Sequence, residues 1–132
     1  MFNGLNINGS ALTAHKTFLD TVSNNIANIN TPAAPGEDTY KRQGVILESF
    51  KDTLQHQLGV HVSLITKSDR EDRLVYDEEN PYADEDGYVH YADINLEEEM
   101  ADMLVAQRGY QMNLTALNSM REIYETALTI GQ

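Results

Sequence analysis

The sequence predicts a mainly α-helical protein with a small β region. Long N- and C-terminal helices pair as a coiled-coil-like hairpin, and a short antiparallel β insertion lies between them. Apolar residues recur every seven positions over residues 5–29 and again over 97–130, and turn-rich, alternating sequence fills the middle. With 132 residues the chain suits one domain. We expect residues 1–31 plus 94–132 to form the helical core, and 32–93 to form a linker and a small outer, acidic, β-rich region.

The N-terminal helix is predicted over Leu5 to Ile29, because its apolar residues fall on one helical face. Pro32 sets its end, since the residue before a proline is disfavoured in a helix. Gly4 and Gly9 each cost roughly 1 kcal/mol relative to alanine, so we expect the first turns to fray or to order only on contact. The residues expected to pack against other helices are Leu5, Leu12, Phe18, Leu19, Val22 and Ile26.

The middle of the chain is predicted to hold short strands separated by turns. Val60 to Ile65 alternates apolar and polar residues, which is typical of a half-buried strand. The other strand candidates are Gly44–Leu47, Leu74–Tyr76 and Tyr88–Tyr91. Their composition marks Asp77–Pro81 and Asp84–Gly87 as turns. The polar residues 51–58 indicate neither helix nor strand.

The C-terminal helix is predicted from about Glu97 to Ile130, a length of ~50 Å at 1.5 Å per residue. Asn95 can cap it, and Glu98 three residues later suggests a capping box. Acidic residues in the first turn suit the helix dipole. The residues expected to pack against other helices are Met103, Tyr110, Leu114, Leu117, Tyr124 and Leu128.

Negative charge is concentrated in one internal segment. The formal net charge is −12, and residues 69–102 hold fourteen acids against two bases, so the rest of the chain is neutral. This balance disfavours nucleic acid and anionic lipid as partners, because both require clustered Lys and Arg. The segment from Thr21 to Gly36 lacks charge but is too polar to insert into a membrane. The acidic segment is either a solvated surface or an electrostatic face toward a basic partner.

The two apolar faces are wider than a two-helix seam requires. Ala11 and Phe18 flank the N-terminal face, and Ala106, Met120 and Ala127 flank the C-terminal one. Burying a leucine-sized side chain contributes roughly 1.5–3 kcal/mol, so we expect further helices to join the bundle. The alternative is an isolated helical hairpin with a β insertion, whose spare apolar groups are exposed.

No pattern of an enzyme or a metal site is found. Cysteine is absent and the four histidines are scattered, without a His-Glu-x-x-His motif or a phosphate-binding loop. His15 lies on the apolar face, where we expect a packed or partner-facing role. Asp84–Gly87 resembles part of a calcium loop, but Tyr82 and Asp93 occupy two ligand positions. We therefore expect no catalytic residue, cofactor or metal, and an acidic helical protein-binding module remains an alternative function.

Two blocks resemble motifs of the flagellar rod and hook family. The first is Ser23-Asn-Asn-Ile-Ala-Asn28 followed by Thr31-Pro32, and the second is Arg108-Gly-Tyr110 followed by Asn113. The matching motif residues are Asn24, Asn25, Ile26, Ala27, Asn28, Thr31, Arg108, Tyr110 and Asn113.

The middle of the chain resembles the short proximal-rod branch of that family. The matching blocks are Leu74–Asp77, Asn80-Pro81, Ala83-Asp84, Gly87–Val89 and Glu99-Met100. Departures occur at Asn80, at Ala92-Asp93 and in the stretch from Ala33 to Tyr40, and they affect local loop geometry.

The resemblance implies a structural subunit of the proximal rod and no enzymatic activity. Such subunits are exported from the cytoplasm by the flagellar type III export apparatus without a cleaved signal peptide. In the periplasmic space, their terminal helices pack as a coiled coil around a central channel, and the β region faces outward. The expected partners are copies of the chain, other rod proteins, the rod–export-gate adaptor, the export apparatus and, as a further contact, the surrounding ring.

Overall fold

The computed structural model describes residues 2–52 and 57–131. Two long helices enclose four strands in the chain order, which confirms the predicted fold class. The elements are α1 (Phe2–Ala27), β1 (Gln43–Asp52), β2 (Gln57–Lys67), β3 (Arg73–Tyr76), β4 (Tyr88–Tyr91) and α2 (Leu96–Ile130).

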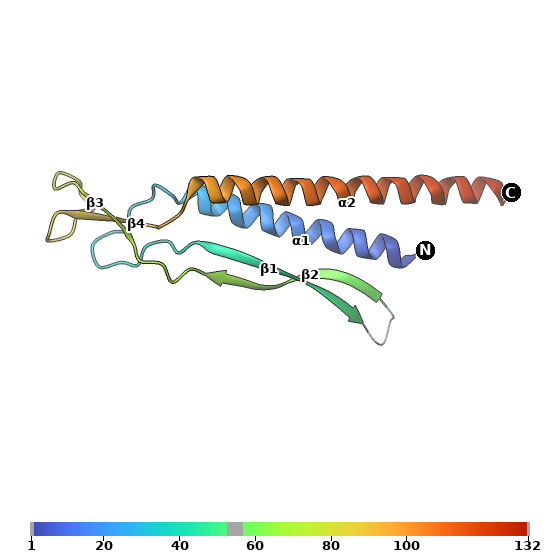
Figure 1. Ribbon diagram of the computed structural model, residues 1–132, viewed down its shortest axis with the longest axis horizontal. Helices are drawn as coiled ribbons and strands as arrows, with labels where there is room; N and C mark the ends of the chain where they lie inside the picture. The colour runs from blue at the N-terminus through green and yellow to red at the C-terminus, as the bar shows by residue number, and fades with distance from the viewer. Residues whose placement is uncertain (1, 53–56, 132) are drawn as a thin grey trace.

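The elements form three layers with α1 in the middle. The antiparallel helix α2 packs on one side of α1, and the β1–β2 hairpin packs on the other (Figure 1). Both termini lie at one end of the molecule, and the β3–β4 hairpin lies at the opposite end. Since α2 has 35 residues and α1 has 26, the end of α2 extends ~14 Å beyond its partner at 1.5 Å per residue.

Helix α1 begins and ends earlier than the apolar pattern predicts. It starts at Phe2 rather than Leu5, and its first turn lies against α2 because Gly4 faces the side chain of Met120. It ends at Ala27, since the amide of Asn28 donates to the carbonyl oxygens of both Asn24 and Asn25, at 3.2 Å each, and the chain tightens into a turn.

The β1–β2 hairpin is longer than the sequence indicates. It contains the predicted runs 44–47 and 60–65 and extends into residues 51–58, of which 53–56 lie outside the described residues. The surface of α1 supports this extension: Ser10 Oγ accepts a hydrogen bond from the amide of Val60 at 3.0 Å. A side chain in place of Gly59 would lie within 2.8 Å of both Ser10 and Phe50, so the strand approaches α1 closely here.

The β3–β4 hairpin matches the predicted strands. Arg73 pairs with Tyr91, and Tyr76 pairs with Tyr88. Gly87, in the predicted turn before β4, has a φ of 82°. This left-handed conformation favours glycine, which explains why a glycine occurs at this position of the predicted turn.

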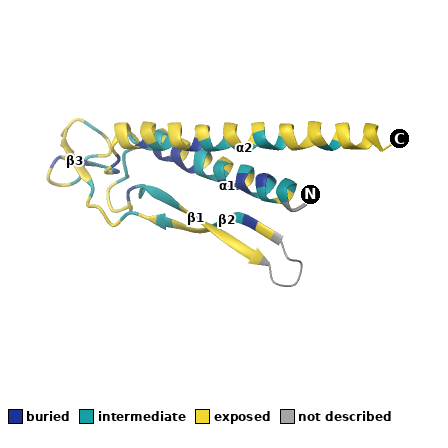
Figure 2. Ribbon diagram, turned by 45° about the vertical axis from the view of Figure 1, so that its right-hand side comes forward, coloured by how far each residue is buried: buried dark blue, intermediate teal, exposed yellow. Residues whose placement is uncertain are grey.

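Few of the described residues are buried (Figure 2), and the buried apolar side chains are mostly small. These buried apolar residues are Ala11, Ala14, Val22, Val89, Ala92, Ile94 and Ala106. Larger apolar side chains remain exposed along α2. Among the described residues, no helix is both long enough and apolar enough to cross a membrane.

Candidate functional site

Three contacts fix the register of α1 against α2. Gly4 faces Met120, the ring of His15 lies on Gly109, and Asn25 bonds to Glu99. Along α1 the three positions are separated by eleven and then ten residues, and their partners on α2 are separated by the same numbers of residues in the reverse direction. The two helices therefore run antiparallel without slippage. The ring nitrogen Nδ1 of His15 is buried with no hydrogen-bond partner among the described residues, so this histidine packs within the chain.

The predicted packing residues divide into two groups. The first group is buried or half-buried: Leu5, Leu12, Phe18, Leu19, Val22, Ile26, Met103, Tyr110, Leu117 and Tyr124. The second group, Leu114 and Leu128, is 39% and 56% exposed. Leu114 lies at the edge of the seam between the two helices, and Leu128 lies beyond the start of α1, because Met120 already faces Gly4. The heptad series 103, 110, 117 and 124 thus faces α1, whereas the series 100, 114 and 128 is left uncovered.

Helix α2 carries two exposed apolar flanks, one on each side of the seam. The first flank consists of Val105, Met112, Ile123 and Ile130, and the second of Met100 and Leu114. Spacings of seven, eleven and fourteen residues keep each set on one face of a helix with 3.6 residues per turn. Opposite the seam runs a polar strip of Arg108, Gln111, Thr115 and Glu122, with Leu104 near its start.

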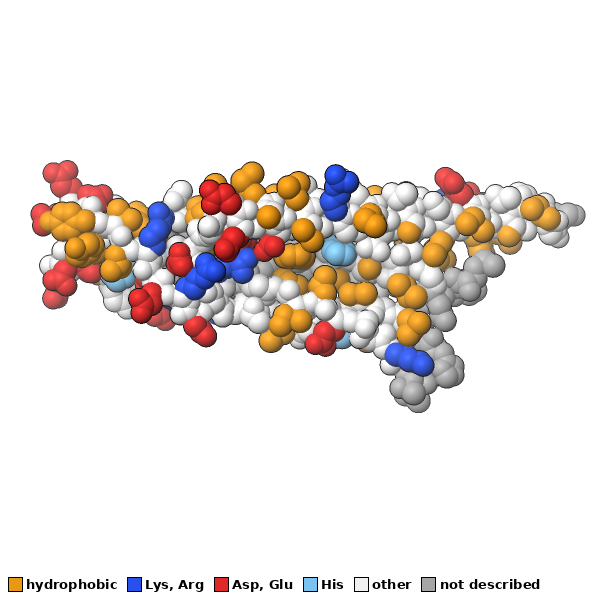
Figure 3. Space-filling model, in the orientation of Figure 1, with side chains coloured by type: hydrophobic (Ala, Val, Ile, Leu, Met, Phe, Trp, Pro, Cys, Tyr) orange, Lys and Arg blue, Asp and Glu red, His pale blue; other side chains and the backbone are white. Residues whose placement is uncertain are grey.

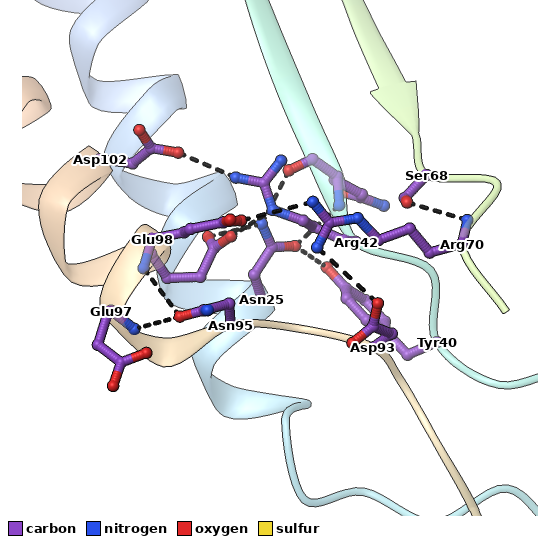
Figure 4. Close-up of polar contacts among 12 residues, drawn as sticks. Asn25, Tyr40, Arg42, Ser68, Arg70, Asp93, Asn95, Glu97, Glu98 and Asp102 are labelled. Atoms are coloured by element: carbon purple, nitrogen blue, oxygen red, sulfur yellow. Dashed lines mark hydrogen bonds and ion pairs between the residues drawn. The ribbon is translucent and has the colours of Figure 1, made fainter. Parts of the chain in front are cut away.

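A buried polar hub joins the end of α1, the start of β1 and the first turn of α2 (Figure 4). Its centre is the fully buried amide of Asn25. This amide donates to the Gln43 carbonyl oxygen at 2.8 Å and to Glu99 Oε2 at 2.9 Å, and it accepts from the Gln43 amide at 2.9 Å and the Tyr40 hydroxyl at 2.8 Å. Both N–H groups and both lone pairs of this side-chain amide are thereby used within the chain.

Glu99 is the charged member of the hub, and its side chain is fully buried. Arg42 compensates it by donating from Nε to Glu99 Oε1 at 2.5 Å and from Nη2 to Asp102 Oδ2 at 2.9 Å. Burial opposes the charge on Arg42, but the hydrogen bond and attraction of Glu99 outweigh it and raise the Arg42 pKa. Burial, followed by the charge of Glu99, raises the pKa of Tyr40. The hub is thus a paired and hydrogen-bonded buried charge.

Residues 39–42 form a strap between this hub and a second polar cluster. Tyr40 and Arg42 contact the hub, whereas Thr39 Oγ1 and Lys41 Nζ bond to Asp72 Oδ1 at 2.5 and 2.8 Å. Side chains of an extended chain alternate between opposite sides. The strap therefore connects the helical layers to the segment that leads into β3.

The second cluster is centred on His90 in β4. Its Nδ1 lies 3.3 Å from Asp72 Oδ2, and its Nε2 lies 3.0 Å from Asp84 Oδ2. The hydrogen bond with Asp84 is the main cause that raises the pKa of His90. Lys41 lowers the pKa of Asp72, and the backbone amide of Tyr88, followed by His90, lowers that of Asp84.

The start of α2 is capped as predicted, but without the reciprocal half of the capping box. Asn95 Oδ1 accepts from the amides of Glu97 and Glu98, at 2.9 and 3.2 Å. The Glu98 carboxylate instead approaches Arg70 at 3.7 Å, and Arg70 lies 3.8 Å from Asp93 (Figure 4). Other acidic side chains gather at the β3–β4 end, and apolar side chains follow the helices (Figure 3).

The motif residues have different structural roles. Asn25 is the centre of the hub, whereas Asn28 Nδ2 and Asn113 Nδ2 bond to backbone carbonyls four residues earlier, at 2.8 and 2.7 Å. Ile26 and Tyr110 are half-buried. The exposed motif residues are Asn24, Ala27, Thr31 and Arg108.

Sequence reasoning missed the roles of Arg42 and Tyr40 and treated Glu99 only as a favourable charge near the helix start. One signal was present. Glu99 lies seven residues before Ala106 and so falls on the α1-facing side of α2. A carboxylate at such a position requires a cation, and Arg42 provides it.

Comparisons with known proteins agree with the motifs at both ends of the chain. Residues 5–34 match the family described as flagella basal body rod protein, and residues 85–130 match the C-terminal family of flagellar basal body rod FlgEFG proteins. The flagellar basal-body rod protein FlgC of Bacillus subtilis is 38% identical over 99% of this chain and 98% of its own length. Those of Borreliella burgdorferi and Salmonella typhimurium are 34% and 32% identical, each over 100% of this chain and 98% of their own length.

Proposed function

The chain belongs to the FlgC family of flagellar basal-body rod proteins and is a structural subunit of the rod, and we propose that it assembles there through the two exposed flanks of α2. Assembly with other basal-body rod proteins follows from the family. Relatives that match over the full length favour this role over an unrelated acidic binding module.

The observation that carries this proposal is the uncovered apolar surface of α2. Met112, Ile123 and Ile130 are 71%, 64% and 80% exposed, although they repeat on one helical face. Burying each such side chain contributes roughly 1.5–3 kcal/mol. Neighbouring helices supply that burial in an assembled rod, so each subunit completes its core only beside other subunits.

The polar strip suggests which way α2 faces. Apolar flanks on both sides favour side-by-side packing of α2 helices from adjacent subunits. The strip of Arg108, Gln111, Thr115 and Glu122 is then left free to face water. In our proposal this strip lines the central channel of the rod, and the β hairpins lie toward the outside.

The finer assignments rest on the family. We place the subunit in the proximal rod, in the periplasmic space, after export by the flagellar type III apparatus. Residues 1–31 and 94–132 form its helical rod domain, and residues 32–93 its outer region. Its neighbours are copies of itself, other rod proteins, the rod–export-gate adaptor and the surrounding ring.

A pair of matched substitutions tests the assembly surface. Met112→Asp puts a charge on the first flank, and Thr115→Asp puts the same charge on the polar strip. Both positions are exposed, so each variant is expected to change the free energy of unfolding by no more than about 0.5 kcal/mol. In a strain lacking the wild-type protein, Met112→Asp should abolish isolated basal bodies and swimming, and Thr115→Asp should retain both. Normal rods with Met112→Asp would refute the proposed surface.

A further inference from the structure

His90 is placed so that only its protonated form satisfies its surroundings. Both ring nitrogens lie within hydrogen-bonding distance of a carboxylate oxygen, Asp72 on one side and Asp84 on the other. A neutral imidazole has a single N–H and can donate to one of them. An imidazolium has two N–H groups and donates to both.

We propose that His90, Asp72 and Asp84 form a proton-dependent clasp that holds the β3–β4 hairpin to the strap of residues 39–42. The bound proton is the ligand of this site. When His90 loses it, one carboxylate loses its donor, and the hairpin is held less firmly.

The charged groups around the site favour the protonated form. A cavity of about 410 Å³ adjoins His90 and is lined by Lys41 from the strap and by the segment before β3, which contributes Asp69, Arg70, Glu71 and Asp72. On β3, Arg73 is directed elsewhere, over the ring of Tyr91 at 5.2 Å and toward the carbonyl oxygen of Ile29 at 3.3 Å.

The charges in direct contact with the His90 ring are those of Asp72 and Asp84, and both stabilise an added positive charge. The His90 side chain is 38% exposed, which lets protons exchange with solvent.

The clasp acts on a specific mechanical link. Asp72 also binds Thr39 and Lys41, and the same strap contacts the hub through Tyr40 and Arg42. Loss of the proton therefore leaves Asp72 bound to the strap, and Asp84 Oδ1 still accepts from the amides of Asp86 and Tyr88 at 3.0 and 2.8 Å. Only the hydrogen bonds of the His90 ring are weakened. The hairpin stays attached through the amide of Ala33, which donates to the His90 carbonyl oxygen at 3.0 Å, so loss of the proton loosens the hairpin without detaching it.

The pH range of the clasp follows from the signs of the shifts. The folded pKa of His90 is raised above 6.5, so its contribution is complete below pH 6.5 and is lost as the pH rises through the raised value. The folded pKa values of Asp72 and Asp84 lie below 3.8, so their contribution is lost only as the pH falls below that point.

An NMR titration of the full chain tests the clasp. The His90 imidazole should titrate with a midpoint above 6.5, and the protection factor of the Val89 amide should fall several-fold over the same pH range. Asp84→Asn should lower the midpoint and reduce Val89 protection at pH 6. The matched control is Asp86→Asn, which removes the same charge two residues away in the same turn, and it should leave both nearly unchanged.

Two results would overturn the proposal. One is a His90 midpoint at or below 6.5 in the wild-type chain. The other is an equal effect of Asp84→Asn and Asp86→Asn, which would show that overall charge, rather than the bridging geometry, sets the response. Circular dichroism of each variant identifies a chain that fails to fold, and in that case Asp72→Asn provides the second measurement on the other ring nitrogen.

Discussion

The ring of His15 on α1 lies directly on Gly109 of α2. A Cβ atom placed on Gly109 would be 2.4 Å from His15 Cε1 and 2.7 Å from both ring nitrogens. The two helices approach this closely because position 109 has no side chain. The glycine of the Arg108-Gly-Tyr110 motif therefore has a packing role, midway between the contact of Gly4 with Met120 and the hub at Asn25.

Gly109→Ala should destabilise the folded chain despite the helix propensity of alanine. The added methyl overlaps His15, and overpacking of this kind costs typically 1–3 kcal/mol, whereas alanine gains only about 1 kcal/mol in a helix interior. Urea unfolding followed by circular dichroism measures the difference. The matched control is Gly9→Ala on α1, where nothing lies within 4 Å of the added atom. It should stabilise the chain, and a stabilising Gly109→Ala would contradict the observed packing.

Asn25→Asp should destabilise the hub, although the new side chain has almost the same shape as the old one. The substitution replaces the amide donor by a second carboxylate beside the buried Glu99 and the Gln43 carbonyl oxygen. Breaking a buried charged network in this way costs about 3–5 kcal/mol. Asn24→Asp, at an exposed neighbouring position, is the control and should change the unfolding free energy by less than about 0.5 kcal/mol. Equal stabilities of the two variants in urea would contradict the central role of Asn25.

Ala116→Pro should break α2 within the seam. Proline removes the bond from its own nitrogen to the carbonyl of Met112 and clashes with that carbonyl, at about 3 kcal/mol or more. The control is Leu96→Pro at the first position of α2, directly after the cap Asn95, where proline is well tolerated. Helical ellipticity and swimming in soft agar should be lost for the first variant and retained for the second. Unchanged ellipticity in Ala116→Pro would show that α2 is not continuous there.

The contribution of the His90 cluster to the free energy of unfolding should be greatest between about pH 4 and 6.5. Within this range His90 is protonated and both aspartates are ionised, so all three contributions are present. Stability should fall above it as His90 deprotonates, and below it as Asp72 and Asp84 take up protons. Denaturant midpoints measured from pH 3 to 9 test this profile. His90→Leu should remove the loss of stability at alkaline pH that the cluster causes. If the same loss persists in this variant, other titrating groups cause it.

The two long helices could be predicted because the spacing of apolar residues within each segment is by itself enough to indicate a helix. The cap of α2 at Asn95 and the turn at Gly87 both follow from short-range rules. The bounds shifted by a few residues where a contact intervened, as at Gly4, which Met120 covers. The β1–β2 hairpin exceeded its prediction because support from Ser10 of α1 is not visible in the local sequence.

The polar clusters could not be predicted for a different reason. Asn25, Tyr40, Arg42 and Glu99 come from three segments, and no spacing rule relates them. The motif resemblance singled out Asn25 without giving its partners. The division of the apolar faces into a seam and two flanks also depends on the angle at which α1 meets α2, and packing rather than composition sets this angle.

The separation of Asn25 and Glu99 has a consequence for the order in which the molecule can fold. The two residues are 74 positions apart, and each is fully buried in the finished structure. A chain threaded through a narrow pore from either end cannot bring them together until more than half its length has emerged. Until then the hydrogen bond between Asn25 and Glu99 cannot form, and α2 cannot dock on α1 at this point. Premature folding of the leading part is thereby disfavoured by the same hydrogen bond that closes the finished subunit.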